Sequence, residues 1–402
     1  MKYIVVLADG MADYPIAELG DKTPMEYART PNFDFFASRG VMGMVKTVPE
    51  GFSPGSDTAN LSVLGYDPEK YYSGRSPFEA ASIGIALEPT DITFRCNLVT
   101  LTEEEPYDEK TILDHSADEI STGEAAELIR AVNESFKTES LEFHPGISYR
   151  HILVWHNAPK DYTLTPPHDI LPKIIGPYLP MGGDSALLLK MMKESYDLLK
   201  DHPVNLKRKE RGLRPANSIW LWGEGRKPAL TGFEEKYKIK GSVISAVDLV
   251  RGIGACAGMN VLIVPGVTGN VHTNYVGKAR AALEELAKGR DFVYIHIEAP
   301  DEAGHRAELE NKVLAIEKID EEVVGSLLAG LEGEDFRIMV LPDHPTPLSL
   351  RTHTSEPVPF VIFDSGKQKD RQDVFTEKSA ARTGVYIEKG YTLMDAFIQG
   401  RL

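Results

Sequence analysis

One stretch decides the fold: Phe292-Val-Tyr-Ile-His-Ile-Glu-Ala-Pro-Asp-Glu-Ala-Gly-His305. Residues 292–297 are mostly apolar and rich in β-branched side chains, which predicts a buried strand. Asp301 and His305 follow, four residues apart. On a helical turn this spacing places a carboxylate and an imidazole on one face, within reach of one metal ion, and Gly304 permits a close approach. In isolation, the same spacing is more typical of an N-cap aspartate followed by a surface histidine.

The same pattern of an apolar run ending in metal-binding side chains occurs twice more. Asp9 directly follows the run at residues 3–8, and Asp343 and His344 follow the run at 336–341. His353 comes shortly afterwards. Each residue alone is explained by a turn or a surface position, but all of them lie at the ends of strands in one inferred sheet. Because the carboxyl ends of parallel strands meet at one edge, we expect these side chains to converge.

Ser56 is the candidate nucleophile. It follows Pro54-Gly55 and precedes a helical pattern, so it lies at the N-cap or in the first turn of a helix. A capping serine would explain this position. A nucleophile activated by a neighbouring metal, with helix N–H groups stabilising phosphoryl oxygens, would explain it as well. Aspartates and histidines with one hydroxyl suit two divalent cations, so the sequence predicts a metal-dependent phosphoryl-transfer enzyme.

The order of predicted elements indicates two domains, one α/β and one α+β. Helical patterns at 276–288 and 308–328 alternate with strand-like runs near both ends of the chain, which predicts one parallel-sheet domain formed by residues 1–74 and 240–402. Residues 75–239 read as an inserted α+β substrate domain, with a strand at 90–101 and a helix beginning near Ser121. We expect hinges near residues 72–76 and 236–242 whose motion assembles the site.

Composition limits the possible partners. The chain has 402 residues, two cysteines and a formal net charge of -16, so nucleic acid and anionic membranes are not expected partners. The apolar segment at the N-terminus is too short for a signal peptide, which favours a cytoplasmic location. The two cysteines, Cys96 and Cys256, lack the spacing of a disulfide framework or a thiolate metal site. The sequence leaves the oligomeric state open.

Several stretches together resemble the cofactor-independent phosphoglycerate mutases of the archaeal type, a branch of the alkaline phosphatase superfamily. The matching stretches are Ala8-Asp-Gly-Met, Ser53-Pro-Gly-Ser-Asp-Thr-Ala-Asn, Ser245-Ala-Val-Asp-Leu-Val-Arg-Gly-Ile-Gly, Thr273-Asn-Tyr-Val-Gly-Lys-Ala-Arg, Ala299-Pro-Asp-Glu-Ala-Gly-His and Asp343-His-Pro-Thr-Pro-Leu-Ser-Leu-Arg-Thr-His. The resemblance implies an alkaline-phosphatase-like fold and interconversion of 3-phosphoglycerate and 2-phosphoglycerate, a step of glycolysis and gluconeogenesis, without bisphosphoglycerate.

The resemblance also implies roles for individual residues. Asp301, His305 and His353 would hold one divalent ion, and Asp9, Ser56, Asp343 and His344 would hold the other. Manganese is expected, while magnesium, cobalt and zinc also suit such ligands. The phosphoryl group of the substrate would pass through phospho-Ser56.

The substrate is expected to be a small phosphorylated carboxylate. Lys278 is a candidate phosphate contact, against the alternative of a solvated helix lysine. The inserted domain offers arginine, histidine and aspartate side chains for the carboxylate and hydroxyls, since the guanidinium fork matches a carboxylate. These candidates are Arg75, Arg150, His151, His168 and Asp169.

One departure from the family pattern keeps alternatives open. Where the family is expected to have an arginine, this chain has Trp222 in Asn217-Ser-Ile-Trp-Leu-Trp-Gly-Glu-Gly. The departure resembles a bacterial subgroup proposed to act as a homoserine kinase in threonine synthesis. A phosphatase or phosphonate hydrolase is a further alternative, in which water resolves phospho-Ser56. A non-enzymatic metal-binding module explains the aspartates and histidines but leaves Ser56 without a purpose.

Overall fold

The computed structural model describes residues 1–159, 161–368 and 373–402. The chain divides into two compact units. The first unit comprises Met1–Tyr72 and Ala229–Leu402, and the second comprises Ser73–Pro228. Both termini therefore belong to the first unit.

The first unit is organised around a mixed sheet. Within the described residues it has eight strands, in the order β11-β10-β12-β1-β13-β14-β2-β15. Their bounds are Asn260–Leu262, Gly241–Ile244, Phe292–Ile297, Lys2–Ala8, Phe336–Leu341, Val358–Asp364, Val41–Val45 and Tyr386–Ile387. The five strands from β11 to β13 are parallel, whereas β14 runs antiparallel to both of its neighbours. The predicted α/β class is confirmed, and β14 is reversed because a loop instead of a crossover helix joins it to β13.

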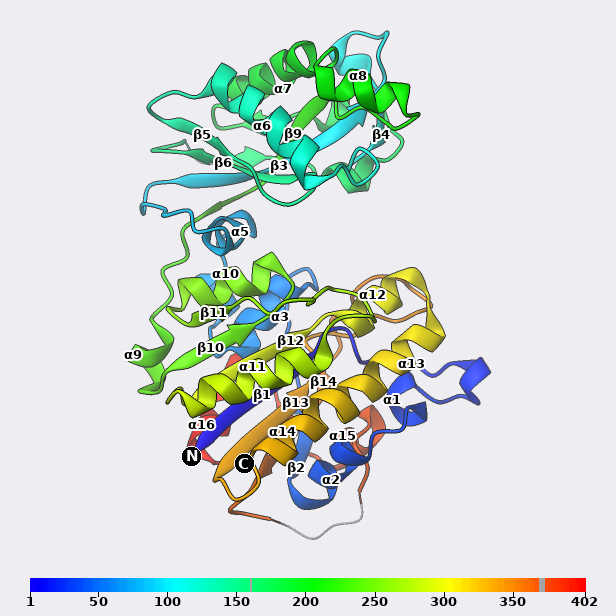
Figure 1. The fold of residues 1–402 in the computed structure, drawn as a ribbon, viewed down its shortest axis with the longest axis vertical. Coiled ribbons are helices and arrows are strands. Elements are labelled where there is room, and N and C mark those ends of the chain that lie inside the picture. Colours follow the sequence, from blue (N-terminus) through cyan, green and yellow to red (C-terminus); the bar gives the residue numbers. More distant parts are fainter. Residues whose placement is uncertain (160, 369–372) are drawn as a thin grey trace. The chain divides into compact units, whose positions relative to one another are not determined.

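Helices cover the sheet, which explains why β1, β12 and β13 are apolar on both faces. Helices α11, α13 and α14 lie over one face of the sheet (Figure 1). Small and aliphatic side chains of these helices share one buried core with Ile4, Val6 and Ile295. The helices of this unit are α1 Pro24–Tyr27, α2 Pro31–Arg39, α3 Ser56–Val63, α4 Pro68–Tyr71, α9 Phe233–Tyr237, α10 Asp248–Cys256, α11 Tyr275–Ala287, α12 Ala299–Arg306, α13 Leu309–Lys318, α14 Gly325–Gly330, α15 Glu377–Arg382 and α16 Leu393–Gln399. Among the described helices, none has the length and apolar character needed to cross a membrane.

The predicted continuous helix at 308–328 is interrupted. A π-helical segment, Ile319–Val324, separates α13 from α14. Within this segment the buried Asp320 accepts hydrogen bonds from the backbone N–H groups of Asn32 and Phe33, in the first turn of α2. A tertiary contact therefore accompanies the widened turn, and sequence periodicity alone carries no signal of it.

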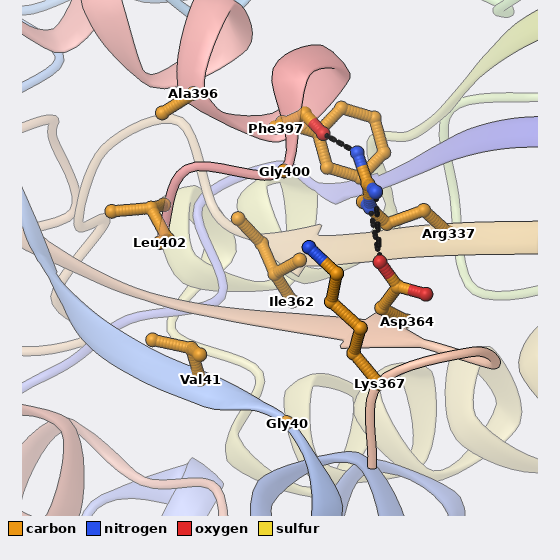
Figure 2. A pocket seen from close by; sticks show the side chains of 10 residues that line it. All are labelled: Gly40, Val41, Arg337, Ile362, Asp364, Lys367, Ala396, Phe397, Gly400 and Leu402. Carbon is orange, nitrogen blue, oxygen red and sulfur yellow. Dashed lines mark hydrogen bonds and ion pairs between the residues drawn. The ribbon is translucent and has the colours of Figure 1, made fainter.

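The C-terminal helix α16 is held by one buried arginine. Arg337 donates hydrogen bonds to the carbonyls of Phe397 and Ile398 at 2.6 and 2.9 Å, and its Nε donates to Asp364 at 2.9 Å (Figure 2). Tyr3 of β1 adds an edge-on contact with the Phe397 ring. Arg337 thus satisfies carbonyls at the end of α16 that lack partners within the helix.

The second unit contains a separate antiparallel sheet. Its strands within the described residues follow the order β4-β3-β6-β5, and β9 pairs with β3. Their bounds are Ile112–Asp114, Ile92–Leu101, Arg150–Trp155, Leu141–His144 and Ser218–Arg226; β7 Tyr162–Thr163 pairs with β8 Met181–Gly182. Helices α6 Thr122–Phe136 and α7 Ser185–Leu199 share a core with this sheet, and α5 Ser76–Ser82 and α8 Pro203–Glu210 complete the unit. The predicted start of a helix near Ser121 is confirmed, because Ser121 accepts a hydrogen bond from the Glu124 N–H as N-cap.

A buried ion pair fixes two loops at the carboxyl edge of the large sheet. Lys312 on α13 contacts Asp13 at 2.7 Å, and both side chains are almost completely buried. Lys312 also donates to the Thr346 carbonyl at 2.8 Å, and Asp13 accepts from the Leu348 N–H at 3.2 Å. The pair therefore joins the loop after β1 to the loop after β13.

Replacing Lys312 by methionine tests this connection. Lys312→Met leaves the Asp13 carboxylate buried without its cation, so we expect the free energy of unfolding to fall by about 3–5 kcal/mol. The control Lys318→Met removes a more exposed i,i+4 pair with Glu322 and should cost less than about 1 kcal/mol. Chemical unfolding should be followed by far-UV circular dichroism, which reports on the secondary structure of both units. Tryptophan fluorescence would not report on the first unit, because Trp155, Trp220 and Trp222 all lie in the second unit. Equal stability losses in the two variants would contradict this role.

Candidate active site

Four neighbouring strands bring the candidate residues together. The strands β10, β12, β1 and β13 lie side by side in parallel, so their carboxyl ends form one edge. Asp9 directly follows β1, and Asp343 and His344 follow β13. Asp301 and His305 lie on α12, which begins at Ala299 just after β12, so their predicted helical spacing is confirmed.

The first cluster of side chains contains the candidate nucleophile. The hydroxyl of Ser56, the first residue of α3, lies 3.5 Å from Asp9 Oδ2 and 3.2 Å from His344 Nε2. His344 Nε2 in turn lies 3.4 Å from Asp343 Oδ2 and 3.6 Å from Asp9 Oδ1. One hydroxyl, two carboxylates and one imidazole therefore face the same small volume.

The second cluster surrounds Asp301. Its two carboxylate oxygens lie 3.2 Å from His305 Nε2 and 3.3 Å from His353 Nε2, and these two ring nitrogens are 2.8 Å apart. The His344 and His353 rings lie with their centroids 4.0 Å apart, which joins the two clusters. The structure thus places all seven predicted metal ligands in one site.

Two glycines make this close packing possible. Gly10 has a φ of +62°, and a Cβ at this position would lie 2.7 Å from the backbone of Asp301. A Cβ at Gly304 would lie 2.6 Å from the Thr346 carbonyl. A larger residue at either position would displace the backbone that carries a candidate ligand, so the tight approach expected at Gly304 is confirmed.

Hydrogen bonds from neighbouring residues orient the carboxylates. Asn60 of α3 donates to Asp343 Oδ2 at 2.9 Å, and its own side-chain oxygen accepts from the Tyr294 hydroxyl at 2.7 Å. The Thr346 hydroxyl donates to Asp301. Asn60 lies within a stretch that the sequence analysis singled out, but its contact with Asp343 joins α3 to the loop after β13, and sequence spacing alone did not predict it.

The charge balance of the site suits divalent cations. Asp9, Asp301 and Asp343 are buried together, and burial with the charges of Asp343 and Asp301 raises the pKa of Asp9 well above its ordinary value. Burial opposes ionisation of Asp301 as well, but hydrogen bonds from His305 and His353 hold its pKa below the ordinary value. Metal ions would remove the repulsion between these carboxylates, and the mixture of oxygen and imidazole donors fits such ions.

The structure adds one residue that the sequence analysis missed. His296, near the end of β12, is fully buried, and its Nε2 lies 3.0 Å from Asp9 Oδ2. Asp9, His296 and Asp343 form one group of potential metal ligands, and Asp301, His344 and His353 form another. A polar residue within the otherwise apolar run 292–297 was the available signal for His296.

Lys278, on α11, contacts the backbone of His296. Its side chain is fully buried, and its Nζ donates a hydrogen bond to the His296 carbonyl at 2.7 Å. Burial lowers the pKa of Lys278 to about 7. The solvated-lysine alternative is therefore wrong, and in this structure the ammonium group contacts the backbone of β12.

The comparisons with known proteins agree with this geometry. A family model for 2,3-bisphosphoglycerate-independent phosphoglycerate mutase matches residues 37–205. The chain is 50% identical over 402 residues to a probable 2,3-bisphosphoglycerate-independent phosphoglycerate mutase of Geobacter sulfurreducens, covering 99% of this chain and 100% of that protein. The chain belongs to the family of 2,3-bisphosphoglycerate-independent phosphoglycerate mutases.

The chain is also similar to a further curated relative and to two solved structures. The enzyme of Methanothrix thermoacetophila is 48% identical, with full coverage of both chains. The solved structure of the cofactor-independent phosphoglycerate mutase of Thermoplasma acidophilum has a TM-score of 0.66 and 29% identity, covering 99% of each chain. A protein of Pyrococcus horikoshii has a TM-score of 0.83 and 29% identity, covering 100% of this chain and 98% of that chain.

The second unit of this family member contains a cluster of arginines. Arg75 and Arg95 each contact one oxygen of the buried Glu79 at 2.9 Å, and the charge of Arg150 also acts on Glu79. The guanidinium of Arg95 lies 4.2 Å from the centre of the Trp222 ring, and β-sheet pairing places these two residues directly opposite each other. Arg95, on the neighbouring strand, therefore places a positive charge beside Trp222.

The remaining predicted substrate contacts divide into two groups. His168 packs edge-on against Trp222 with ring centroids 5.3 Å apart, and the exposed Asp169 lies beside it. His151 is buried in β6, where its Nδ1 accepts from the Gly146 N–H at 3.0 Å. Because alternate residues of a strand face opposite sides of the sheet, His151 points away from the side chain of Arg150. The structure does not bring His151 into the arginine cluster.

Protonation of His305 provides a test of the second cluster. In the metal-free protein, the hydrogen bond that His305 donates to the Asp301 carboxylate raises the pKa of His305 from 6.5 to about 9. This interaction stabilises the metal-free protein below about pH 6.5 and is lost as the pH rises through about 9. A cation can bind His305 only after the proton leaves, so we expect Mn²⁺ binding near neutral pH to release a proton and to strengthen as the pH rises toward 9.

Calorimetric titration with Mn²⁺ in buffers of different ionisation enthalpy measures this release. The variant His305→Ala should lose the proton release above about pH 7. Proton release that is equal in the variant and the wild type would contradict the assignment of His305.

Proposed function

We propose that this protein interconverts 3-phosphoglycerate and 2-phosphoglycerate through phospho-Ser56, with two divalent ions, manganese by preference, bound by the aspartates and histidines of the site. The observation that carries the proposal is the position of Ser56. Its hydroxyl stands at the first turn of α3, within 3.5 Å of Asp9 and 3.2 Å of His344, in a chain of this mutase family.

Each part of phosphoryl transfer can be assigned to a group of the site. Ser56 Oγ attacks phosphorus and loses its proton, and the glycerate oxygen leaves with the former bonding electron pair and takes up a proton. The second transfer returns the group to the other hydroxyl of the glycerate. Backbone N–H groups in the first turn of α3 face the phosphoryl oxygens and stabilise their negative charge. Bound divalent ions neutralise further charge on the transferred group.

The arginine cluster supports recognition of the glycerate carboxylate. Arg75 and Arg95 keep their charge while sharing Glu79, and planar guanidinium groups match a carboxylate. The stacking of Arg95 on Trp222 places a guanidinium beside the position where an arginine is expected from the family resemblance, so Trp222 leaves positive charge in this part of the sheet. We therefore assign recognition of the small phosphorylated carboxylate to the second unit, with Arg75, Arg150 and His168 as candidate contacts.

Substitution of the nucleophile tests the proposed route. Ser56→Ala removes the oxygen that accepts the phosphoryl group, so we expect mutase activity to fall by on the order of 10³ or more. The matched control is Ser62→Ala, which removes a buried hydroxyl from the same helix. Ser62→Ala should retain activity, and circular dichroism should show that both variants are folded. Wild-type turnover by Ser56→Ala would overturn the phosphoserine assignment.

A parallel assay separates the candidate activities. Manganese-loaded protein is incubated with 3-phosphoglycerate and, separately, with homoserine and ATP. We expect 2-phosphoglycerate from the first mixture, no phosphohomoserine from the second and no accumulation of free phosphate. Chelator treatment should abolish activity, and added Mn²⁺ should restore it, because the buried carboxylates require a cation. Phosphohomoserine would favour the kinase alternative, and free phosphate would favour the hydrolase alternative.

A further inference from the structure

We propose that His296 is itself a metal ligand of this site, binding through Nε2 together with Asp9 and Asp343. This inference rests on the proposed metal-dependent function and adds a residue to its machinery. It assigns a role to the histidine of β12 that sequence spacing did not single out.

The first argument is the state of His296 Nε2. The ring is fully buried, and Nε2 lies 3.0 Å from Asp9 Oδ2. Despite this short distance, His296 Nε2 and Asp9 Oδ1 both lack a hydrogen-bond partner within the described part of the chain. Buried polar atoms without a hydrogen-bond partner are costly. A cation bound by His296 Nε2 and the Asp9 carboxylate would satisfy both residues.

The second argument is the other ring nitrogen. His296 Nδ1 lies 3.2 Å from the Ser245 hydroxyl, and this hydroxyl also accepts from the Val247 N–H at 2.9 Å. With a proton on Nδ1 donated to Ser245, Nε2 carries the free electron pair that metal coordination requires. Such a partner on the second nitrogen is the usual arrangement of metal-binding histidines.

The third argument is that separate segments converge to hold His296 in place. Ser245 follows β10, the strand beside β12, and it fixes the ring. Lys278 of α11 fixes the backbone through its hydrogen bond to the His296 carbonyl. The stretches that begin at Ser245 and Thr273 contribute no residue to either ligand group. Their contacts with His296 explain why both stretches lie beside the site.

The assignment also changes the division of the ligands. Within each of two groups, one ligand atom from every residue lies within 4.8 Å of the others. The first contains Asp9, His296 and Asp343, and the second contains Asp301, His344 and His353. His344 belongs to the second group, but its Nε2 also lies 3.4 Å from Asp343 Oδ2. The Ser56 hydroxyl, between Asp9 and His344, lies between the two groups.

Metal binding measured apart from turnover tests the assignment. Wild type, His296→Ala, Ser245→Ala and the control Ser242→Ala are titrated with Mn²⁺ by calorimetry and with Co²⁺ by visible absorption. Ser242 is a buried serine of β10 whose hydroxyl contacts Glu285, away from the site. We expect wild type and Ser242→Ala to bind two ions. Ser245→Ala should weaken one of them about 10-fold, and His296→Ala should weaken the same ion further and shift the Co²⁺ absorption band.

Each outcome bears on the assignment. Two ions bound by His296→Ala with wild-type affinity and an unchanged Co²⁺ band would overturn it. If His296→Ala does not fold, Ser245→Ala decides: unchanged affinity for both ions overturns the assignment, and selective weakening of one supports it. Failure of wild type to bind two ions or to convert 3-phosphoglycerate would instead reject the proposed function, so the two failures are distinguishable.

Discussion

The burial of Asp9, Asp301 and Asp343 beside one another is the constraint on which the rest of the first unit depends. Three carboxylates removed from water repel one another and raise the pKa of at least one of them, as the raised pKa of Asp9 shows. A fold can retain such a cluster only if hydrogen bonds, histidines or bound cations offset the cost. The surrounding residues supply the first two, and the geometry suits the third.

The sheet explains how these carboxylates reach one place. Parallel pairing of β10, β12, β1 and β13 aligns four carboxyl ends, and each end contributes a polar residue: Ser245, His296, Asp9 and Asp343. The Lys312–Asp13 pair then ties together the loops after β1 and β13, so the same contacts that stabilise the unit also position the site.

The second unit shows a different use of charge. Its arginines are gathered around Glu79, which keeps several guanidinium groups close together despite their mutual repulsion. The stacking of Arg95 on Trp222 shows that a neighbouring strand can bring a positive charge to a position that has none of its own, because directly paired residues share one face of the sheet. A motif read along the chain alone misses this kind of contact between strands.

The sequence by itself determined the α/β class, the strands that end at the site and the types of ligand that those ends carry. It could do so because apolar runs followed by aspartate or histidine are local patterns, and parallel strands bring their carboxyl ends to one edge. Only the tertiary structure decided that His296 faces Asp9, that Lys278 contacts the His296 carbonyl and that Arg95 stacks on Trp222. These contacts join residues far apart in the chain, and they depend on strand order, register and side-chain direction, which local pattern does not encode.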